Sequence, residues 1–137
     1  MLTAELIELD VFVENPTEAI SRAGNLLVSI GSCSSSYVEA MIRRETIYPT
    51  AFNPGFAIPH GTVSDLALVS FASLSIVRLA APIPWHGVDV RVVFGLAARP
   101  GENLNILGKV ADVAQSPDHW GRLLASRDED EVLQLLQ

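Results

Sequence analysis

The hydrophobic period changes twice along this chain of 137 residues, and these changes constrain its fold most. Over residues 17–30, Ile20, Ala23 and Leu27 recur at the spacing of one helical face. Over residues 88–96 the period falls to two, which is typical of a strand. Helical spacing then returns toward the C-terminus. Helices on both sides of a strand-rich middle predict an α/β sandwich, in which a mixed β-sheet is flanked by helices.

The predicted elements follow one another with only short loops between them. Strands are expected over residues 56–59, 68–79 and 88–96, and helices over residues 17–30, 36–47, 102–114, 117–125 and 128–136. Asn15 or Thr17 could cap the first helix, with Pro16 in its first turn. The weak alternation over residues 68–79 indicates a strand that is covered on both faces. The length suits one compact unit, so residues 1–137 are expected to form a single domain.

The charge of the chain argues against two classes of partner. Sixteen Asp and Glu against nine Lys and Arg give a formal net charge of −7. Nucleic acid and anionic membrane surfaces both select a basic face, so neither is expected as the main partner.

The N-terminus lacks the pattern of a signal peptide, and the longest near-apolar run is too short and polar to cross a bilayer. We therefore expect a cytoplasmic protein without direct membrane insertion.

Neither a metal nor a nucleotide cofactor is expected. Cys33 is the only cysteine, which excludes a disulfide within the chain and a cysteine-rich zinc site. No pair of candidate ligands has the usual short spacing, and no Gly-rich phosphate loop is present. Cys33 is interpreted as a small packed residue. We assign His86 to a surface turn and His119 to a structural or solvated position on a short helix.

His60 lies between Pro59 and Gly61, just after a predicted strand. Proline fixes the local backbone and glycine removes side-chain bulk, so one face of the imidazole should be accessible. A neutral imidazole has one lone-pair nitrogen that can act as a nucleophile, while a backbone carbonyl can hold the other nitrogen. Taken alone, this pattern also fits an ordinary histidine in a surface loop.

The surroundings of His60 favour the chemical interpretation. The Arg44-Glu45 pair, Thr50 and residues 57–61 (Ala-Ile-Pro-His-Gly) together resemble the active-site region of the type 2 EIIA proteins of the bacterial phosphotransferase system, the mannitol/fructose family. In that family an Arg-Glu pair ends a helix, a threonine follows, and a similar segment holds the phosphorylated histidine. Weaker similarities at residues 37–41, 94–99 and 128–136 extend the resemblance over nearly the whole chain.

The resemblance implies a phosphoryl relay. His60 would accept a phosphoryl group from the phosphohistidine of HPr and pass it to a cysteine of EIIB, which in turn serves the membrane component EIIC. Such transfer depends on positioning and on neutralising the phosphoryl oxygens, so Arg44 is implied to stabilise the phosphate. Glu45 could orient Arg44 or be solvated. Thr50 is expected to cap its own loop rather than to bind near the phosphate.

One position departs from the mannitol-type pattern. Those members carry a second histidine where this chain has Asn103, which can donate a hydrogen bond to phosphate but carries no charge. Asn103 could instead cap a helix. This difference, together with residues 48–50 (Tyr-Pro-Thr), favours a galactitol-like branch, whereas residues 60–62 (His-Gly-Thr) look more mannitol-like.

Two further functions share the same sequence features. Nitrogen-type regulatory members of the family use the phosphorylated state to control a partner protein, and this is the alternative function. In a third hypothesis His60 is inert and the chain only binds. Around the histidine, Phe52, Pro54 and Phe56 could form the rim of a docking surface or could belong to the core.

Overall fold

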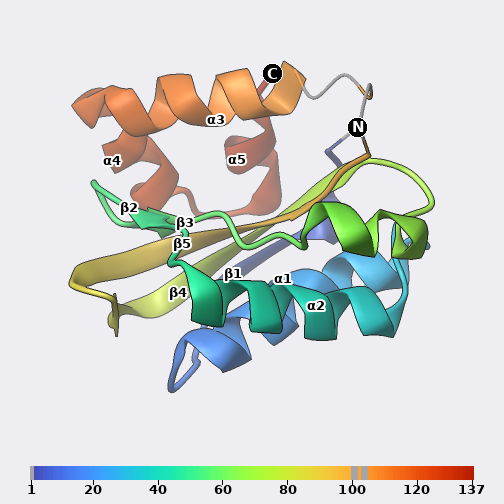
Figure 1. Cartoon of the computed structure of the whole chain (residues 1–137). Coiled ribbons are helices and arrows are strands. Elements are labelled where there is room, and N and C mark those ends of the chain that lie inside the picture. Colours follow the sequence, from blue (N-terminus) through green and yellow to red (C-terminus); the bar gives the residue numbers. More distant parts are fainter. Residues whose placement is uncertain (1, 100–101, 103–104) are drawn as a thin grey trace.

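The computed structural model describes residues 2–99, 102 and 105–137. Its middle layer is a five-stranded sheet in the order β1-β4-β5-β3-β2 (Figure 1). The β1–β4 and β3–β5 pairs are parallel, and the β4–β5 and β2–β3 pairs are antiparallel. The predicted α/β fold with a mixed sheet is confirmed. The strands are β1 (Ile7–Val11), β2 (Ala51–Phe52), β3 (Phe56–Ala57), β4 (Ser73–Trp85) and β5 (Val88–Ala97).

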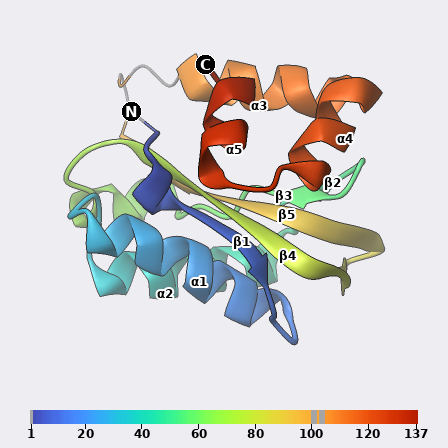
Figure 2. The same ribbon diagram turned by 180° about the vertical axis from the view of Figure 1, so that it is seen from behind.

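Helices cover both faces of the sheet. One face carries α1 (Pro16–Ser29) and α2 (Ser35–Ile47). The opposite face carries α3 (Asn105–Gln115), α4 (Pro117–Ala125) and α5 (Glu129–Leu135), an arrangement that the reverse view also shows (Figure 2). Two short 3-10 helices, η1 (Ala4–Leu6) and η2 (Val63–Leu68), precede β1 and β4. No helix in the described part of the chain is both long and apolar enough to cross a membrane.

Each face of the sheet has its own hydrophobic core. Successive side chains of a strand point to opposite faces, so Val93 of β5 packs toward α1 and α2 while Phe94 packs toward α3, α4 and α5. Every residue of β4 from 73 to 79 is buried. This confirms the prediction that both faces of that strand are covered.

The ends of the helices follow the expected capping chemistry. The side chain of Asn15 accepts a hydrogen bond from the amide of Glu18 at 2.9 Å, and Pro16 takes the first position of α1. Asp128 caps α5 in the same way, by accepting from the amide of Glu131 at 3.0 Å. Asn15 is therefore the cap of the first helix, and Thr17 is not.

The strands differ from the sequence prediction at their bounds. Neither β1 nor β2 was predicted from the sequence, and β4 starts at Ser73 rather than at residue 68 because η2 occupies residues 63–68. β4 continues past Leu79 through Pro82 and Pro84, where β1 no longer pairs with it. Prolines are tolerated there because that side of the strand needs no backbone donor. His86 lies in the exposed turn after β4, as predicted.

Candidate functional site

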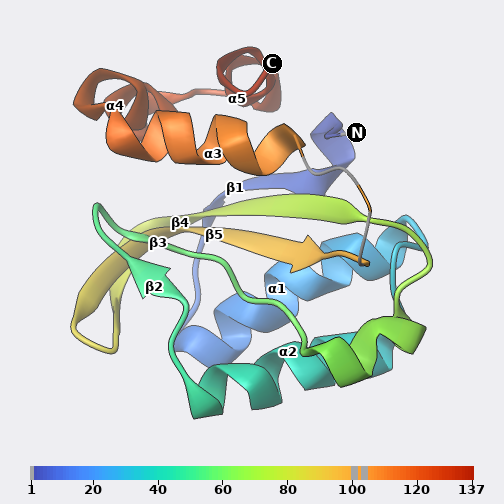
Figure 3. The same ribbon diagram turned by 45° about the horizontal axis from the view of Figure 1, so that its top comes forward.

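His60 lies where two parallel strands reach their carboxyl ends. The chain leaves β3 and continues beside β5, with His60 opposite Leu96 in a parallel bridge. The amide of Leu96 donates to the carbonyl of Pro59 at 3.0 Å. Figure 3 shows that the segment between β3 and η2 runs between α2 and β5. In open α/β sheets this end of the strands is where ligands bind.

One nitrogen of the His60 ring is held by the backbone. Nδ1 lies 2.8 Å from the carbonyl oxygen of Ile58. A carbonyl oxygen can only accept a hydrogen bond, so Nδ1 carries the proton and Nε2 of the neutral ring keeps its lone pair. The ring is half-buried rather than enclosed by core side chains. The arrangement that the sequence suggested for this histidine is therefore present: one nitrogen is fixed and the other is nucleophilic.

His60 lines an open cavity of about 280 Å³. Val63 at its edge is 82% exposed, so part of the cavity's rim is apolar and accessible to a docking protein. The cavity is lined by Tyr37, His60, Gly61, Thr62, Val63, Leu66, Leu96, Ala98 and Arg99.

The residues after His60 are fixed by a capping box. Thr62 donates to Asp65 from both its amide and its hydroxyl, each at 2.8 Å. These two hydrogen bonds stabilise the carboxylate and hold the pKa of Asp65 below its usual value. Arg43 on α2 adds a weaker attraction at 4.0 Å. The chain is thereby anchored at the start of η2, two residues beyond the histidine.

Glu45 anchors the residues before His60. Its carboxylate is buried, and it accepts hydrogen bonds from the amide and hydroxyl of Thr50 at 2.6 and 2.7 Å and from the indole of Trp85 at 3.1 Å. Thr50 in turn accepts from the amide of Ile58 at 3.0 Å through its carbonyl. Glu45 is thus linked through Thr50 to Ile58, whose carbonyl holds the His60 ring.

These contacts correct both interpretations of Glu45 and the one favoured for Thr50. Glu45 is 5% exposed, so it is not solvated, and its carboxylate contacts Thr50 and Trp85 rather than Arg44. The Thr50 hydroxyl binds a buried carboxylate rather than capping its own loop. Sequence alone did not reveal this link because Trp85, its third member, is 35 to 40 residues further along the chain.

Two arginines are candidates for the cation beside His60. The guanidinium of Arg44 donates to the carbonyl of Tyr48 at 2.7 Å, at the end of its own helix, and Arg44 is not among the residues described as lining the cavity. Arg99, for which the sequence predicted no role, does line it. The position of Arg99 just past a predicted strand could have indicated a residue at the end of the sheet. The pairing of that strand with the His60 segment, which brings Arg99 to the cavity, was not predictable. Asn103 lies outside the described residues.

The aromatic residues upstream of His60 divide between surface and core. Phe52 is half-exposed and Pro54 is exposed, whereas Phe56 packs against Phe94 and Trp120 with ring centroids 6.0 Å apart in each case. None of the three upstream residues is among the described residues that line the cavity.

The other two candidates with reactive side chains do not form a second site. Cys33 is buried, and the loss of hydration raises its pKa to about 11, which confirms its interpretation as a packed residue. His119 is exposed on α4, away from the residues that line the His60 cavity.

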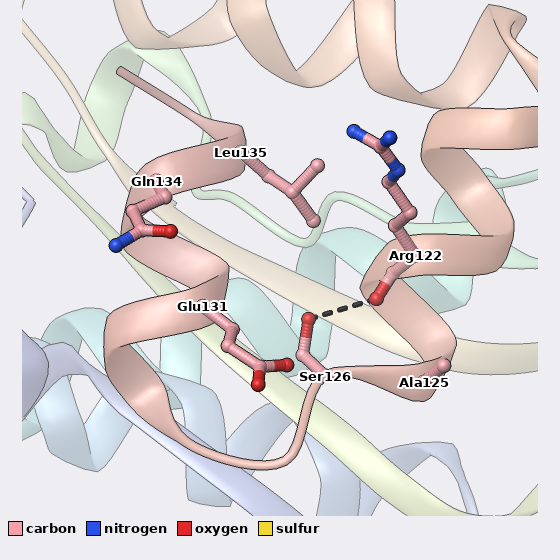
Figure 4. A pocket seen from close by; sticks show the side chains of 6 residues that line it. All are labelled: Arg122, Ala125, Ser126, Glu131, Gln134 and Leu135. Atoms are coloured by element: carbon pink, nitrogen blue, oxygen red, sulfur yellow. Dashed lines mark hydrogen bonds between the residues drawn. The ribbon is translucent and has the colours of Figure 1, made fainter.

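A second cavity, of about 330 Å³, lies between α4 and α5 (Figure 4). Two of its polar side chains already have partners, since the hydroxyl of Ser126 donates to the carbonyl of Arg122 at 2.8 Å and Glu131 accepts from Arg127. None of the described residues that line it carries an imidazole or a thiol. The cavity at His60 is therefore the candidate site for group transfer.

Comparison with known proteins decides the family. Residues 1–137 match the family described as "Phosphoenolpyruvate-dependent sugar phosphotransferase system, EIIA 2". The chain belongs to the EIIA 2 family. It is thus a phosphotransferase component of the sugar phosphotransferase system, as the resemblance at His60 implied.

Relatives of this EIIA protein support the assignment at the level of both sequence and fold. The mannitol-specific phosphotransferase enzyme IIA component of Halalkalibacterium halodurans is 36% identical over 136 residues, which cover 99% of this chain and 94% of that protein. The Escherichia coli complex of the mannitol enzyme IIA with phosphorylated enzyme IIB contains a chain with a TM-score of 0.89 and 30% identity, covering 99% of this chain and 96% of that one.

A regulatory relative is also similar to this EIIA protein. The nitrogen regulatory protein IIA-Ntr of Neisseria meningitidis has a TM-score of 0.82 and 27% identity, covering 98% of this chain and 95% of that one. The expected galactitol-like branch receives no support, because the sugar-specific relatives described here are mannitol proteins.

Proposed function

We propose that residues 1–137 act as one EIIA domain that accepts a phosphoryl group from phospho-HPr on Nε2 of His60. The group then passes to a cysteine of EIIB, which supplies the membrane component EIIC during uptake of a mannitol-type sugar. The observation that carries this proposal is the hydrogen bond from Nδ1 of His60 to the carbonyl of Ile58. It leaves a neutral nucleophilic nitrogen on a half-buried ring that lines an open cavity.

The chemistry at His60 balances without a cofactor. The lone pair of Nε2 forms a bond to phosphorus as the bond between phosphorus and the HPr imidazole breaks, and that imidazole leaves with the electron pair. In the second step an EIIB thiolate attacks the same phosphorus, and His60 leaves as a neutral imidazole. The proton on Nδ1 stays hydrogen-bonded to Ile58 throughout, which stabilises the positive charge of the phosphorylated ring.

The supporting roles follow from the described contacts and from the family resemblance. Glu45 and Thr50 hold the segment that carries the Ile58 carbonyl. Arg44 is proposed to contribute to stabilising the phosphate because it matches the family arginine, and Arg99, which lines the cavity with His60, is proposed to contribute more. Asn103, in place of a second histidine, is proposed to donate a hydrogen bond to a phosphate oxygen. The relatives named for a sugar suggest mannitol rather than galactitol, and a cytoplasmic setting follows from the proposed partners.

A relay assay tests the proposal. The purified protein is incubated with phosphoenolpyruvate, enzyme I and HPr, and labelled phosphate is sought as an acid-labile, base-stable phosphohistidine. We expect His60→Ala to abolish the label. His86→Ala and His119→Ala are the matched controls, since both of these histidines are exposed and neither lines the cavity, and each variant should be labelled like the wild type. A label that persists in His60→Ala would overturn the proposal.

The similarity to the nitrogen regulatory protein of Neisseria meningitidis supports one alternative. In that case the phosphorylated state of His60 controls a partner protein and no sugar is moved. Adding a mannitol-type EIIB to the phosphorylated protein separates the two functions. Transfer of the label to the EIIB cysteine supports transport, and a label that stays on His60 supports regulation. The hypothesis of an inert His60 predicts no label at all.

A further inference from the structure

We propose that Tyr37 is a positioning residue whose buried hydroxyl sets the rate of phosphoryl transfer by holding the His60 segment against the end of β5. This inference deepens the proposed function and rests on it. Tyr37 lies in the first half of α2, whereas the family resemblance placed the important residues of that helix at its end. Nothing in the chemistry proposed above uses this hydroxyl.

The hydroxyl joins the two segments that form the cavity at His60. Tyr37 donates to the carbonyl of Leu96 at 3.0 Å, and its oxygen accepts from the amide of Gly61 at 2.9 Å. The donor assignment is fixed because a carbonyl oxygen only accepts and an amide only donates. Gly61 directly follows His60, and Leu96 is the partner of His60 across the parallel bridge.

The Tyr37 bond completes a set of backbone contacts around His60. On one side, Pro59 accepts from the amide of Leu96, and Ile58 holds the ring at Nδ1. On the other side, the Gly61 amide has the Tyr37 hydroxyl as its described partner. Tyr37 is thus the one described side chain that fixes the residue immediately after the nucleophile. Without it the orientation of His60 would depend on the upstream contacts and on the capping box at η2.

The packing around the tyrosine ring leaves little room for another arrangement. Tyr37 is 2% exposed. A Cβ atom added at Gly61 would lie 2.7 Å from Cε1 of the ring, so glycine at this position lets the backbone lie directly against the tyrosine. Burial also raises the pKa of Tyr37, so its hydroxyl keeps the proton that it donates to Leu96 at physiological pH.

These features predict an effect on the chemical step rather than on docking. A partner protein cannot reach a side chain that is 2% exposed, so removal of the hydroxyl should leave the docking surface unchanged. The position of Nε2 relative to the incoming phosphorus should become less defined. Displacements of this kind cost rate, because group transfer requires the reacting atoms to be held close and in line.

The test is Tyr37→Phe, with Tyr48→Phe as its matched control. These are the two tyrosines of the chain, and Tyr48 is 68% exposed and contacts Arg44 through its backbone carbonyl, which the change keeps. In single-turnover uptake from phospho-HPr, Tyr37→Phe should lower the maximal rate about tenfold with little change in the HPr concentration at half-maximal rate. Tyr48→Phe should behave like the wild type. An unchanged maximal rate in folded Tyr37→Phe would overturn the proposal.

Two measurements test Tyr37 without phosphoryl transfer. In the wild type, the Gly61 amide should exchange with deuterium much more slowly than a free amide, and Tyr37→Phe should abolish this protection while Tyr48→Phe preserves it. The ¹⁵N shifts of the His60 ring should indicate a single tautomer with the proton on Nδ1 in the wild type and a mixture in Tyr37→Phe. An unprotected Gly61 amide in the wild type would overturn the role of Tyr37. A wild-type protein that is not labelled, but shows both signatures, would instead overturn the relay.

Discussion

At the scale of single residues, two arginines could neutralise the phosphoryl group that His60 is proposed to carry. Arg44 matches the family position, yet its guanidinium is engaged by the carbonyl of Tyr48. Arg99 lines the cavity with His60. A cation beside the nucleophile stabilises the negative charge of the phosphoryl oxygens as it develops.

We expect Arg99→Gln to slow phosphoryl uptake about tenfold or more, because the substitution removes the charge while keeping a polar side chain. Arg44→Gln should have a smaller effect in the same single-turnover assay. Arg22→Gln is the control, since Arg22 pairs with Glu8 on the surface. A larger loss in Arg44→Gln than in Arg99→Gln would show that Arg44 leaves Tyr48 and binds the phosphoryl group.

The motif at His60 shows what the sequence could reveal of the site. The segment Ala-Ile-Pro-His-Gly predicted an accessible ring on a fixed backbone from local residues, and its resemblance to the family, together with the Arg44-Glu45 pair, made His60 the proposed nucleophile. The roles of Tyr37 and Arg99 were not predictable, because each depends on β5 lying beside the His60 segment. That pairing joins residues about 36 positions apart and has no local signature.

At the scale of elements, η2 depends on its capping box. Thr62 donates two hydrogen bonds to the carboxylate of Asp65, and a carboxylate accepts such bonds best when it is ionised. The pKa of Asp65 is accordingly lower in the folded protein than in the unfolded chain. The cap therefore adds stability above the unfolded pKa of Asp, and this contribution is lost as the pH falls through the lower folded value.

Comparison of the wild type with Asp65→Asn should reveal this dependence. The wild type should have the larger free energy of unfolding at pH 7, and the difference should shrink as the pH is lowered below about 4. Urea titrations at several pH values measure it. Asp89→Asn is the control, because Asp89 is exposed on β5 and does not lie at the start of a helix. A difference independent of pH would show that the charge of Asp65 does not matter.

Helix bounds were predicted better than strand bounds, for a physical reason. The expected helices at residues 36–47 and 117–125 match α2 and α4 within one residue, because caps, prolines and periodicity are local signals. β1 was missed although it alternates, since a strand of five residues is stabilised by its pairing with distant β4. The two prolines concealed the second half of β4, where only β5 is paired with it.

At the scale of the whole molecule, Arg78 of β4 connects the layers. Its side chain is buried, and one nitrogen donates to the carbonyls of Leu123, Leu124 and Ser126, at 3.1, 3.2 and 2.6 Å. A second nitrogen forms an ion pair with Asp10 at 3.0 Å. The sheet thus supplies the donors that the last carbonyls of α4 need, which a helix cannot provide for itself.

Arg78→Leu should lower the free energy of unfolding by about 3 kcal/mol or more, because it leaves several buried carbonyls without donors. Hydrogen exchange should accelerate first in α4 and α5, while α1 keeps its protection. Arg22→Leu is the control, because Arg22 pairs with Glu8 at the surface and should change stability little. Equal acceleration on both faces of the sheet would show that Arg78 does not act through α4.

Only Nε2 of the His60 ring is available for transfer, and this has a consequence for how the phosphorylated fraction of the protein would respond to sugar uptake. In the proposed relay, His60 cannot accept from one partner and donate to the other at the same moment, so each molecule is either phosphorylated or not, and the two partners compete for the same ring. The phosphorylated fraction of the protein then depends on the rate of phosphorylation relative to the rate of transfer to the acceptor. Under this proposal, the ratio would rise and fall with demand for the sugar, and both a transport component and a regulator could use it.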